Sequence, residues 1–169
     1  MRVLWAPWRM EYILSDQTGE GCIFCPGDNR EKDGSRLILY VGDLSMVMMN
    51  RFPYINGHLL VAPVRHVKEL ASLSPEETLD LLTTVTRSIG VLKKVMVPEG
   101  FNVGLNLGKV AGAGVEAHMH FHIVPRWNGD NNYMTVFGEV RVIPEHIEET
   151  YHRLLPHFKE INVVHGGEE

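Results

Sequence analysis

The sequence predicts an α+β fold built on a mainly antiparallel sheet. Three short apolar segments of strand length come first, one long segment with helical spacing follows, and two further strand-like segments and a second helix come last. This grouping of strands around a helix, without regular alternation of the two, is typical of the α+β class. We expect a single domain over residues 1–169, with a core over about 35–127, an N-terminal extension that carries the cysteines and a C-terminal helical tail.

Three strands are expected in the first half of the chain. Leu37–Val41 and Ser45–Asn50 are apolar and are joined by the turn-forming pair Gly42-Asp43, and Gly57–Pro63 is rich in Leu and Val. The preceding segment, Pro26–Arg36, contains Pro, Gly, Asp, Asn and several charges, and we interpret it as a solvated loop.

A long helix is expected after the third strand. It begins at Ser74-Pro75-Glu76-Glu77, where a capping residue precedes a proline and two acids near the positive end of the helix dipole, and Pro98-Glu99-Gly100 ends it. Between these signals, apolar residues recur at spacings of three and four, which is the pattern of one buried face. We expect this face to consist of Leu79, Leu82, Val85, Ile89, Leu92 and Val95.

Two strands and a second helix complete the predicted fold. Phe101–Leu107 and Ala117–Pro125 are strand-like and are separated by a glycine-rich segment. A last helix begins within Pro144–Tyr151. Pro156 is expected to bend or end it, because proline lacks the backbone N–H that a helix interior uses.

Composition and charge restrict the function. The chain has 169 residues, 44% of them hydrophobic, and a formal net charge of −5, which argues against nucleic-acid binding through a broad basic surface. No apolar run is long enough to span a bilayer, and the first residues lack the apolar core of a secretory signal. We therefore expect a cytoplasmic protein with neither nucleic acid nor membrane as a partner.

Three alternating histidines carry most of the functional signal. Side chains of a strand alternate between its two faces, so His118, His120 and His122 point the same way while Met119 and Phe121 point into a core. Three imidazoles on one face have three explanations: hydrogen-bonded structural histidines, metal ligands, or a nucleophile for phosphate chemistry.

The segment upstream of the histidines favours phosphate chemistry. Residues 106–114 read Asn-Leu-Gly-Lys-Val-Ala-Gly-Ala-Gly. Glycines let the backbone approach a ligand and direct its N–H groups at an anion, and Lys109 adds a cation. A flexible loop is the usual meaning of such a segment. Because it lies a few residues from the histidines, we interpret it as a cradle for phosphate oxygens.

The two cysteines of the chain form a separate signal. Cys22-Ile23-Phe24-Cys25 has the spacing of half a zinc site, which needs two further ligands. If the site exists, we expect His66 and His118 to complete it. The alternatives are a redox pair and two thiols buried for packing.

Several segments share a pattern with one known family. Residues 118–124 read His-Met-His-Phe-His-Ile-Val, and Asn50-Arg51-Phe52-Pro53 precedes the apolar strand at Gly57–Pro63. Over roughly residues 5–145 the chain resembles the histidine triad family, which is named after the first of these motifs. Cys-Ile-Phe-Cys is similar to its zinc-bearing prokaryotic members. Residues 5–12 and 125–130 resemble the branch of diadenosine polyphosphate hydrolases and phosphorylases.

The resemblance implies an α+β fold of the histidine triad type that dimerises through its long helix and sheet. It also implies two-step nucleotidyl transfer without a catalytic metal. His120 would attack the α-phosphorus and form a nucleotidyl-histidine intermediate, and His122 would contact the phosphate or the leaving oxygen. One structural Zn²⁺ per chain would be held by Cys22, Cys25, His66 and His118.

The resemblance further implies the substrate contacts. Asn50 would face the ribose, and His58 would orient the triad from behind. Many family members carry Gln, Ser or Thr a few residues before the triad, where this chain has Ala113-Gly114-Val115. Contacts to phosphate oxygens there must therefore come from the backbone. The expected contacts to the substrate are Asn50, His58, Asn106, Gly112, Gly114 and Trp127.

The substrate implied by the resemblance is an adenine dinucleoside polyphosphate, diadenosine tetraphosphate first, bound by a homodimer. Water as acceptor gives hydrolysis, and inorganic phosphate gives phosphorolysis. Three alternatives stay open. The chain acts on a nucleoside phosphoramidate or a nucleotide sugar, it is a non-catalytic nucleotide sensor, or it is a metalloenzyme that uses all three histidines.

Overall fold

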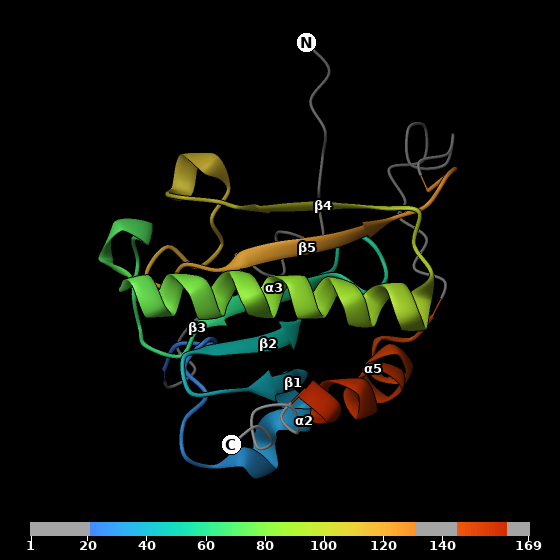
Figure 1. The fold of residues 1–169 in the computed structure, drawn as a ribbon, viewed down its shortest axis with the longest axis horizontal. Helices are drawn as coiled ribbons and strands as arrows, with labels where there is room; N and C mark the ends of the chain where they lie inside the picture. Colours follow the sequence, from blue (N-terminus) through green and yellow to red (C-terminus); the bar gives the residue numbers. More distant parts are fainter. Residues whose placement is uncertain (1–20, 131–144, 162–169) are drawn as a thin grey trace, which may run out of the picture.

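One antiparallel sheet forms the centre of the molecule (Figure 1). The computed structural model describes residues 21–130 and 145–161. In that part of the chain, five strands lie in the order β1-β2-β3-β5-β4, and every neighbouring pair is antiparallel. The strands are β1 (Ile38–Val41), β2 (Ser45–Met49), β3 (Leu59–Pro63), β4 (Gly100–Leu105) and β5 (Phe121–Arg126). The predicted α+β class is therefore confirmed.

Two helices cover one face of this sheet. The long helix α3 (Pro75–Met96) packs against β2 and β3, and α5 (Ile147–Ile161) packs against β1 and α3 (Figure 1). Between these layers lies the larger apolar core, with Leu59 and Ile123 from the sheet and Leu92 and Leu154 from the helices. The remaining helical pieces are short: η1 (Arg30–Lys32), α2 (Asp33–Arg36), η2 (Leu70–Ser72) and η3 (Lys109–Ala111).

Helix α3 begins where the sequence predicts. The Ser74 hydroxyl accepts a hydrogen bond from the Glu77 N–H, and the Glu77 carboxylate accepts one from the Ser74 N–H, which satisfies two otherwise unpaired donors. The same carboxylate is paired with Arg65 at 2.7 Å. Hydrogen bonding to Arg65, with the Ser74 N–H second, lowers the pKa of Glu77 to about 2.

The buried face of α3 differs from the prediction. The predicted Val85 and Leu92 are buried in the core, and Ile89 and Val95 pack against it. Leu79 and Leu82 are 69% and 49% exposed, and Leu81 is buried instead. The buried face also contains the polar Thr84 and Ser88. These are satisfied locally: Ser45 and Thr84 share a hydrogen bond, and the Ser88 hydroxyl donates to the Thr84 carbonyl. The polar Thr84 and Ser88 on the buried face, and leucines on the exposed face, explain why the apolar spacing misplaced Leu79 and Leu82.

Three predicted boundaries also change. The expected loop at 26–36 contains a 3₁₀ turn and the helical turn α2. Helix α5 continues through Pro156 to Ile161, because Tyr151, Leu154 and Phe158 bury one face of it and compensate for the hydrogen bond that proline lacks. Strand β5 begins at Phe121 rather than at Ala117.

The opposite face of the sheet carries a smaller apolar cluster. Phe24, from the segment before β1, packs there with residues that point away from α3: Ile38, Met46, Met48, Leu60 and Ala62. The alternation of side chains along a strand thus gives each central strand two buried faces. No helix in the described part of the chain is long and apolar enough to cross a membrane.

Candidate active site and adjacent metal cluster

The histidine segment lies on the face opposite α3. Met119, Phe121 and Ile123 pack into the larger core, so the histidines between them point to the other side, as the sequence predicts. His122 lies in the middle of the sheet, paired with Leu60 of β3 and Gly104 of β4. His118 and His120 precede β5 and belong to an extended segment that the Met119 N–H ties to the Val67 carbonyl at 2.8 Å.

One hydrogen bond fixes the tautomer of His120. Its Nδ1 lies 3.0 Å from the carbonyl oxygen of His118, and a carbonyl only accepts, so Nδ1 carries the proton. The Nε2 of a neutral ring is then an unprotonated nitrogen with a free lone pair. Nothing among the described residues hydrogen-bonds this Nε2. The residue is 6% exposed, and Nε2 is the one ring nitrogen left without a proton.

A second chain of hydrogen bonds fixes His122. The Tyr54 N–H donates to Nδ1 of the fully buried His58 at 3.1 Å, so the proton of His58 is on Nε2. That N–H lies 3.0 Å from Nδ1 of His122, which must accept. His122 therefore carries its proton on Nε2, and this buried atom has no partner among the described residues. An unpaired buried donor of this kind is suited to bind an oxygen of a substrate.

The electrostatics keep these rings neutral. Burial lowers the pKa of His120, although its bond to the His118 carbonyl opposes the effect. Burial, and secondly the charge of a protonated His120, lowers the pKa of His122 to about 4. The rings of His120 and His122 are 5.0 Å apart. At neutral pH one therefore offers a lone pair and the other an N–H, side by side.

The expected substrate contacts are distributed unevenly. The Asn50 amide lies 3.2 Å from Nδ1 of His58, which in turn contacts His122, so Asn50 is connected to the site through His58. Asn106 donates from its amide to the Gly112 carbonyl at 3.4 Å, which folds the glycine-rich segment back after β4. Gly108 and Gly112 have φ values of 83° and 90° in that segment, a backbone conformation that favours glycine. Gly114 is exposed there.

Trp127 is the predicted contact that the structure does not bring to the histidines. It follows the far end of β5 and donates its indole N–H to the Val97 carbonyl, where α3 ends. It lies five residues beyond His122, which in an extended strand corresponds to roughly 16 Å. The N-terminal segment with Trp5 and Trp8 lies outside the described residues.

Two residues near the histidines were not predicted from the sequence to belong to the site. Gly104 pairs with His122, and a side chain built on it meets no atom within 4 Å, so the face beside His122 is open. A glycine inside a strand was the available signal, because it marks places where a ligand comes close. Phe24 lies 4.4 Å from His120 in a stacked arrangement with an angle of 25° between the rings. No spacing in the sequence indicates that contact.

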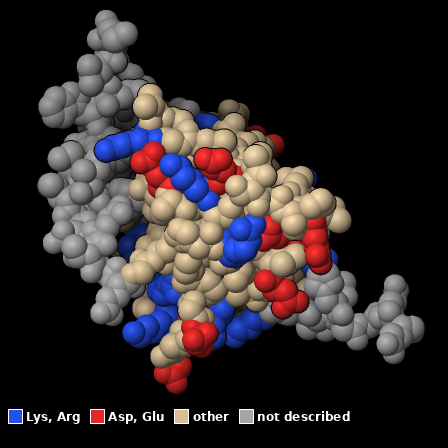
Figure 2. Space-filling model, turned by 90° about the vertical axis from the view of Figure 1, so that its left-hand side faces the viewer, with Lys and Arg blue, Asp and Glu red and all other residues tan. Residues whose placement is uncertain are grey.

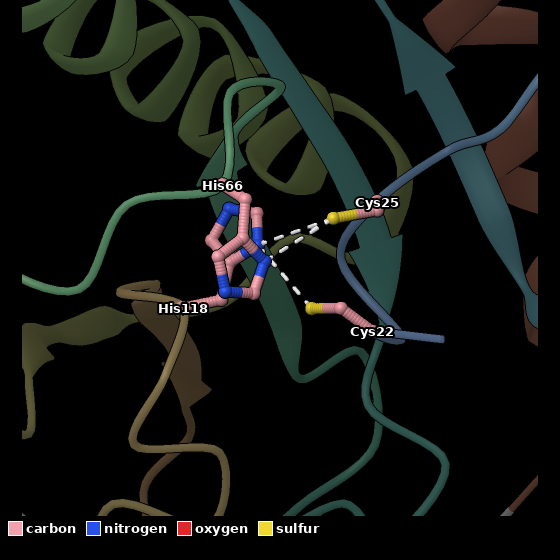
Figure 3. A group of neighbouring side chains, drawn as sticks. All are labelled: Cys22, Cys25, His66 and His118. Atoms are coloured by element: carbon pink, nitrogen blue, oxygen red, sulfur yellow. Dashed lines mark hydrogen bonds between the residues drawn. The ribbon is translucent and has the colours of Figure 1, made fainter. Parts of the chain in front are cut away.

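The two cysteines meet two histidines next to this site (Figure 3). The Sγ of Cys22 is 3.3 Å from Nδ1 of His118, and the Sγ of Cys25 is 3.4 Å from Nδ1 of His66. One candidate ligand atom from each residue lies within 4.8 Å of the others. The structure therefore brings together the four residues that the sequence proposed as one cluster.

The donor set fits Zn²⁺. Two thiols and two imidazoles are one of the donor sets of closed tetrahedral zinc sites. His118 also has the tautomer that a ligand needs: its Nε2–H donates to the Pro63 carbonyl at 2.8 Å, which leaves Nδ1 unprotonated and facing the sulfurs. Burial and the neighbouring Cys22 raise the pKa of Cys25, while Arg36 lowers it, so a bound cation would displace the thiol proton.

The charge distribution around the end of the sheet is mixed. Figure 2 views the side on which α3 begins and shows Lys and Arg interspersed with Asp and Glu among uncharged residues. A surface of this kind differs from the single basic stripe of a protein that binds nucleic-acid backbones.

Comparison with known proteins identifies the family. Residues 31–129 match the model of the HIT domain, so the chain belongs to the histidine triad family. A protein of Mycobacterium tuberculosis named AP-4-A phosphorylase is 39% identical over 154 residues, which cover 87% of this chain and 79% of that protein. Bis(5'-nucleosyl)-tetraphosphatase [asymmetrical] of Schizosaccharomyces pombe is 33% identical and covers 78% of this chain and 69% of its own length.

Solved structures agree with the fold. A Zn-bound histidine triad family protein from Mycobacterium smegmatis superimposes with a TM-score of 0.60 at 25% identity, over 76% of this chain and 87% of that one. The expected resemblance to enzymes of dinucleoside polyphosphates is thus confirmed as a similarity of sequence, and the fold type is confirmed.

Proposed function

We propose that this protein cleaves dinucleoside polyphosphates, diadenosine tetraphosphate first, by transferring a nucleotidyl group to His120. The observation that carries the proposal is the pair of nitrogens at the centre of the site: the unprotonated Nε2 of His120 beside the unpaired Nε2–H of His122. A nucleophile and a hydrogen-bond donor 5.0 Å apart by ring centre suit an attack on phosphorus with stabilisation of the displaced oxygen.

The proposed reaction has two steps. The Nε2 lone pair of His120 bonds to the α-phosphorus, and the bond from that phosphorus to its bridging oxygen breaks, so ATP leaves from diadenosine tetraphosphate and AMP stays on the ring. The His122 N–H and backbone N–H groups after Asn106 bind the phosphate oxygens on which negative charge is spread. A phosphate oxygen then attacks the same phosphorus, the P–N bond breaks, and ADP is released.

The acceptor is inorganic phosphate in this proposal. The support is the relative named AP-4-A phosphorylase, which is more similar to this chain over a longer stretch than the relative named as a tetraphosphatase. Water attacking the same intermediate would give AMP instead of ADP. Because His120 has the same role in both reactions, only the products distinguish them.

Product analysis over a phosphate titration tests the function. With diadenosine tetraphosphate and millimolar phosphate, we expect ADP and ATP in equal amounts. AMP and ATP at every phosphate concentration would replace phosphorolysis by hydrolysis. Quenching without acid, with substrate radiolabelled at the α-phosphorus, should leave label on the wild-type protein and none on His120→Ala. No cleavage of mono- or dinucleotides, and no label, would overturn the proposal.

We further propose that Zn²⁺ occupies the cluster of Cys22, Cys25, His66 and His118 and holds the segment before β1 against the sheet. The tautomer of His118 and the donor set support it. When bound, the metal would serve as a structural cross-link between elements far apart in sequence. Metal analysis of purified protein should then find about one zinc per chain.

We also propose a homodimer formed through α3 and β4. The support is apolar surface on one side of the sheet: Leu79 and Leu82 on α3, and Val103, 45% exposed on the edge strand β4. Val103 pairs with Ile123, so it lies on the α3 face. Sedimentation should give twice the 19.1 kDa of one chain for the wild type and a single chain for Leu82→Glu. A monomeric wild type would contradict the dimer.

A further inference from the structure

The residue between the two cysteines makes the closest ring contact to the proposed nucleophile. Phe24 is 1% exposed, and its ring stacks on His120 with 4.4 Å between ring centres. It also meets His118 edge-on at 5.5 Å. The same short segment thus places its cysteine sulfurs at the metal cluster and its aromatic ring on His120.

Hydrogen bonds from Arg36 also hold this segment in place. The guanidinium of Arg36 donates to three of its backbone carbonyls: those of Ile23 and Cys25, at 2.8 Å each, and that of Pro26, at 2.7 Å. The Cys25 N–H closes the turn on the Cys22 carbonyl at 3.1 Å. A planar group with several fixed donors suits this task, and a lysine would not replace it.

Three neighbours therefore fix the position of the His120 ring. Nδ1 is fixed by the His118 carbonyl, the ring of His122 lies beside it, and Phe24 covers one face. A single hydrogen bond at Nδ1 still tolerates some rotation of the ring about its Cβ–Cγ bond. A flat neighbour removes this freedom and sets the direction in which Nε2 points.

We propose that Phe24 is a positioning residue for the reaction, and that the Cys22–Cys25 cluster and Arg36 act on His120 through it. This inference rests on the proposed function, since it assumes that Nε2 of His120 is the attacking atom. Loss of the metal or of Arg36 releases the segment, and His120 then keeps its tautomer but loses its fixed direction.

The test compares two matched substitutions. Phe24→Leu removes the flat face at the site, and Phe158→Leu removes an equally buried phenylalanine from the core behind α5. Because an error of position costs the rate and not the affinity, Phe24→Leu should lower kcat about 10-fold or more and change KM less than about 2-fold. Phe158→Leu should leave both constants near the wild-type values. Arg36→Lys provides a second route and should lower kcat in the same direction.

A spectroscopic arm measures the same contact without turnover. The chain has nine histidines, and the ring signals of His120 are assigned in ¹³C-histidine NMR spectra as those lost in His120→Ala. Stacking on Phe24 shifts these signals, so Phe24→Leu and metal removal by a chelator should both move them, while Phe158→Leu should not.

The outcomes separate the two proposals. A wild type without nucleotidyl transfer ends the proposed function, and the NMR arm still decides whether Phe24 and the cluster hold the ring. An active wild type, together with a folded Phe24→Leu whose kcat and His120 signals equal those of the wild type, overturns the inference alone. Equal losses of kcat in Phe24→Leu and Phe158→Leu would overturn it as well.

Discussion

Two histidines two residues apart are prepared for opposite tasks. His118 gives its Nε2–H to the Pro63 carbonyl and turns Nδ1 to the cysteine sulfurs. His120 gives its Nδ1–H to the His118 carbonyl and leaves Nε2 free. Both belong to the same alternating motif and point to the same side of the chain. The carbonyl that each ring meets selects the remaining nitrogen, and that choice separates a metal ligand from a nucleophile.

The two tasks also have different consequences when they fail. A structural cluster supports the folded state, so its loss should appear mainly in stability. A nucleophile is used in the transition state, so its loss should appear mainly in the rate. Four experiments test this contrast.

His120→Ala should lower turnover of diadenosine tetraphosphate by at least about 10,000-fold, because no other imidazole in the motif has an unpaired lone pair directed away from the cluster. Nucleotide affinity should change little, and metal content and melting temperature should stay at wild-type values. Steady-state kinetics and calorimetric titration with a non-hydrolysable analogue measure both. Turnover within 10-fold of the wild type would end the assignment.

Cys25→Ser should affect the metal cluster to which His118 belongs. Removing one sulfur ligand opens the cluster, so bound zinc should fall well below one per chain, and stability should fall by about 3 kcal/mol or more. For a chain of this length, that corresponds to roughly 10 °C in melting temperature. A wild type that contains no zinc, and whose melting point a chelator does not change, would leave the cysteines a packing role only.

His58→Phe should have an intermediate effect on the rate. His58 is fully buried and donates to Nδ1 of His122, so its loss lets the His122 proton move to Nδ1 and removes the N–H offered to substrate. We expect kcat to fall about 10- to 100-fold, as for other residues that orient a functional histidine. Unchanged kcat in a folded variant would contradict the role of the hydrogen bonds that link Tyr54, His58 and His122.

The dependence on pH should be the smallest effect. Burial lowers the pKa of His122 to about 4, so this ring stays neutral as pH falls from 7 to 5.5, and burial also lowers the pKa of His120 below its ordinary value. An ordinary imidazole with a pKa near 6.5 would be about 90% protonated at pH 5.5. Turnover should therefore fall less between pH 7 and 5.5 than protonation of an ordinary imidazole would require, whereas an acid limb at or above 6.5 in the kcat profile would contradict the lowered pKa values.

The same shifts set the sign for stability. At His122 the unfolded chain binds a proton below about pH 6.5 and the folded chain only near pH 4, so its contribution to stability is complete above 6.5 and is lost as pH falls; the lowered pKa of His120 acts in the same direction. Glu77 adds to this loss at lower pH, since its folded pKa is about 2. Circular dichroism at each pH is the necessary control for the kinetic profile.

Local rules predicted the elements that depend on one segment at a time. The capping residues at Ser74 fixed the start of α3, and alternation placed the three histidines on one side. The buried stripe of α3 was predicted correctly at Val85 and Leu92 and wrongly at Leu79 and Leu82. Apolar residues occur on two sides of that helix, and only the docked sheet selects Leu81 over Leu79. Pro156 was expected to bend or end α5, yet the helix runs through it to Ile161, where long-range packing compensates for the lost hydrogen bond.

The functional groups of the site could be predicted from sequence spacing alone. They are alternate imidazoles in an extended segment, a glycine-rich segment beside them, and a pair of thiols at zinc-binding spacing. The fold selected the free nitrogens of His118 and His122, because their partners come from other elements: Pro63 belongs to β3, and Tyr54, which fixes His58 and through it His122, lies before β3. The tautomer of His120 depends on the His118 carbonyl of its own segment, but the ring that stacks on it, Phe24, comes from the chain before β1. A tautomer is set by the partners that surround a ring in space, and sequence spacing carries no record of them.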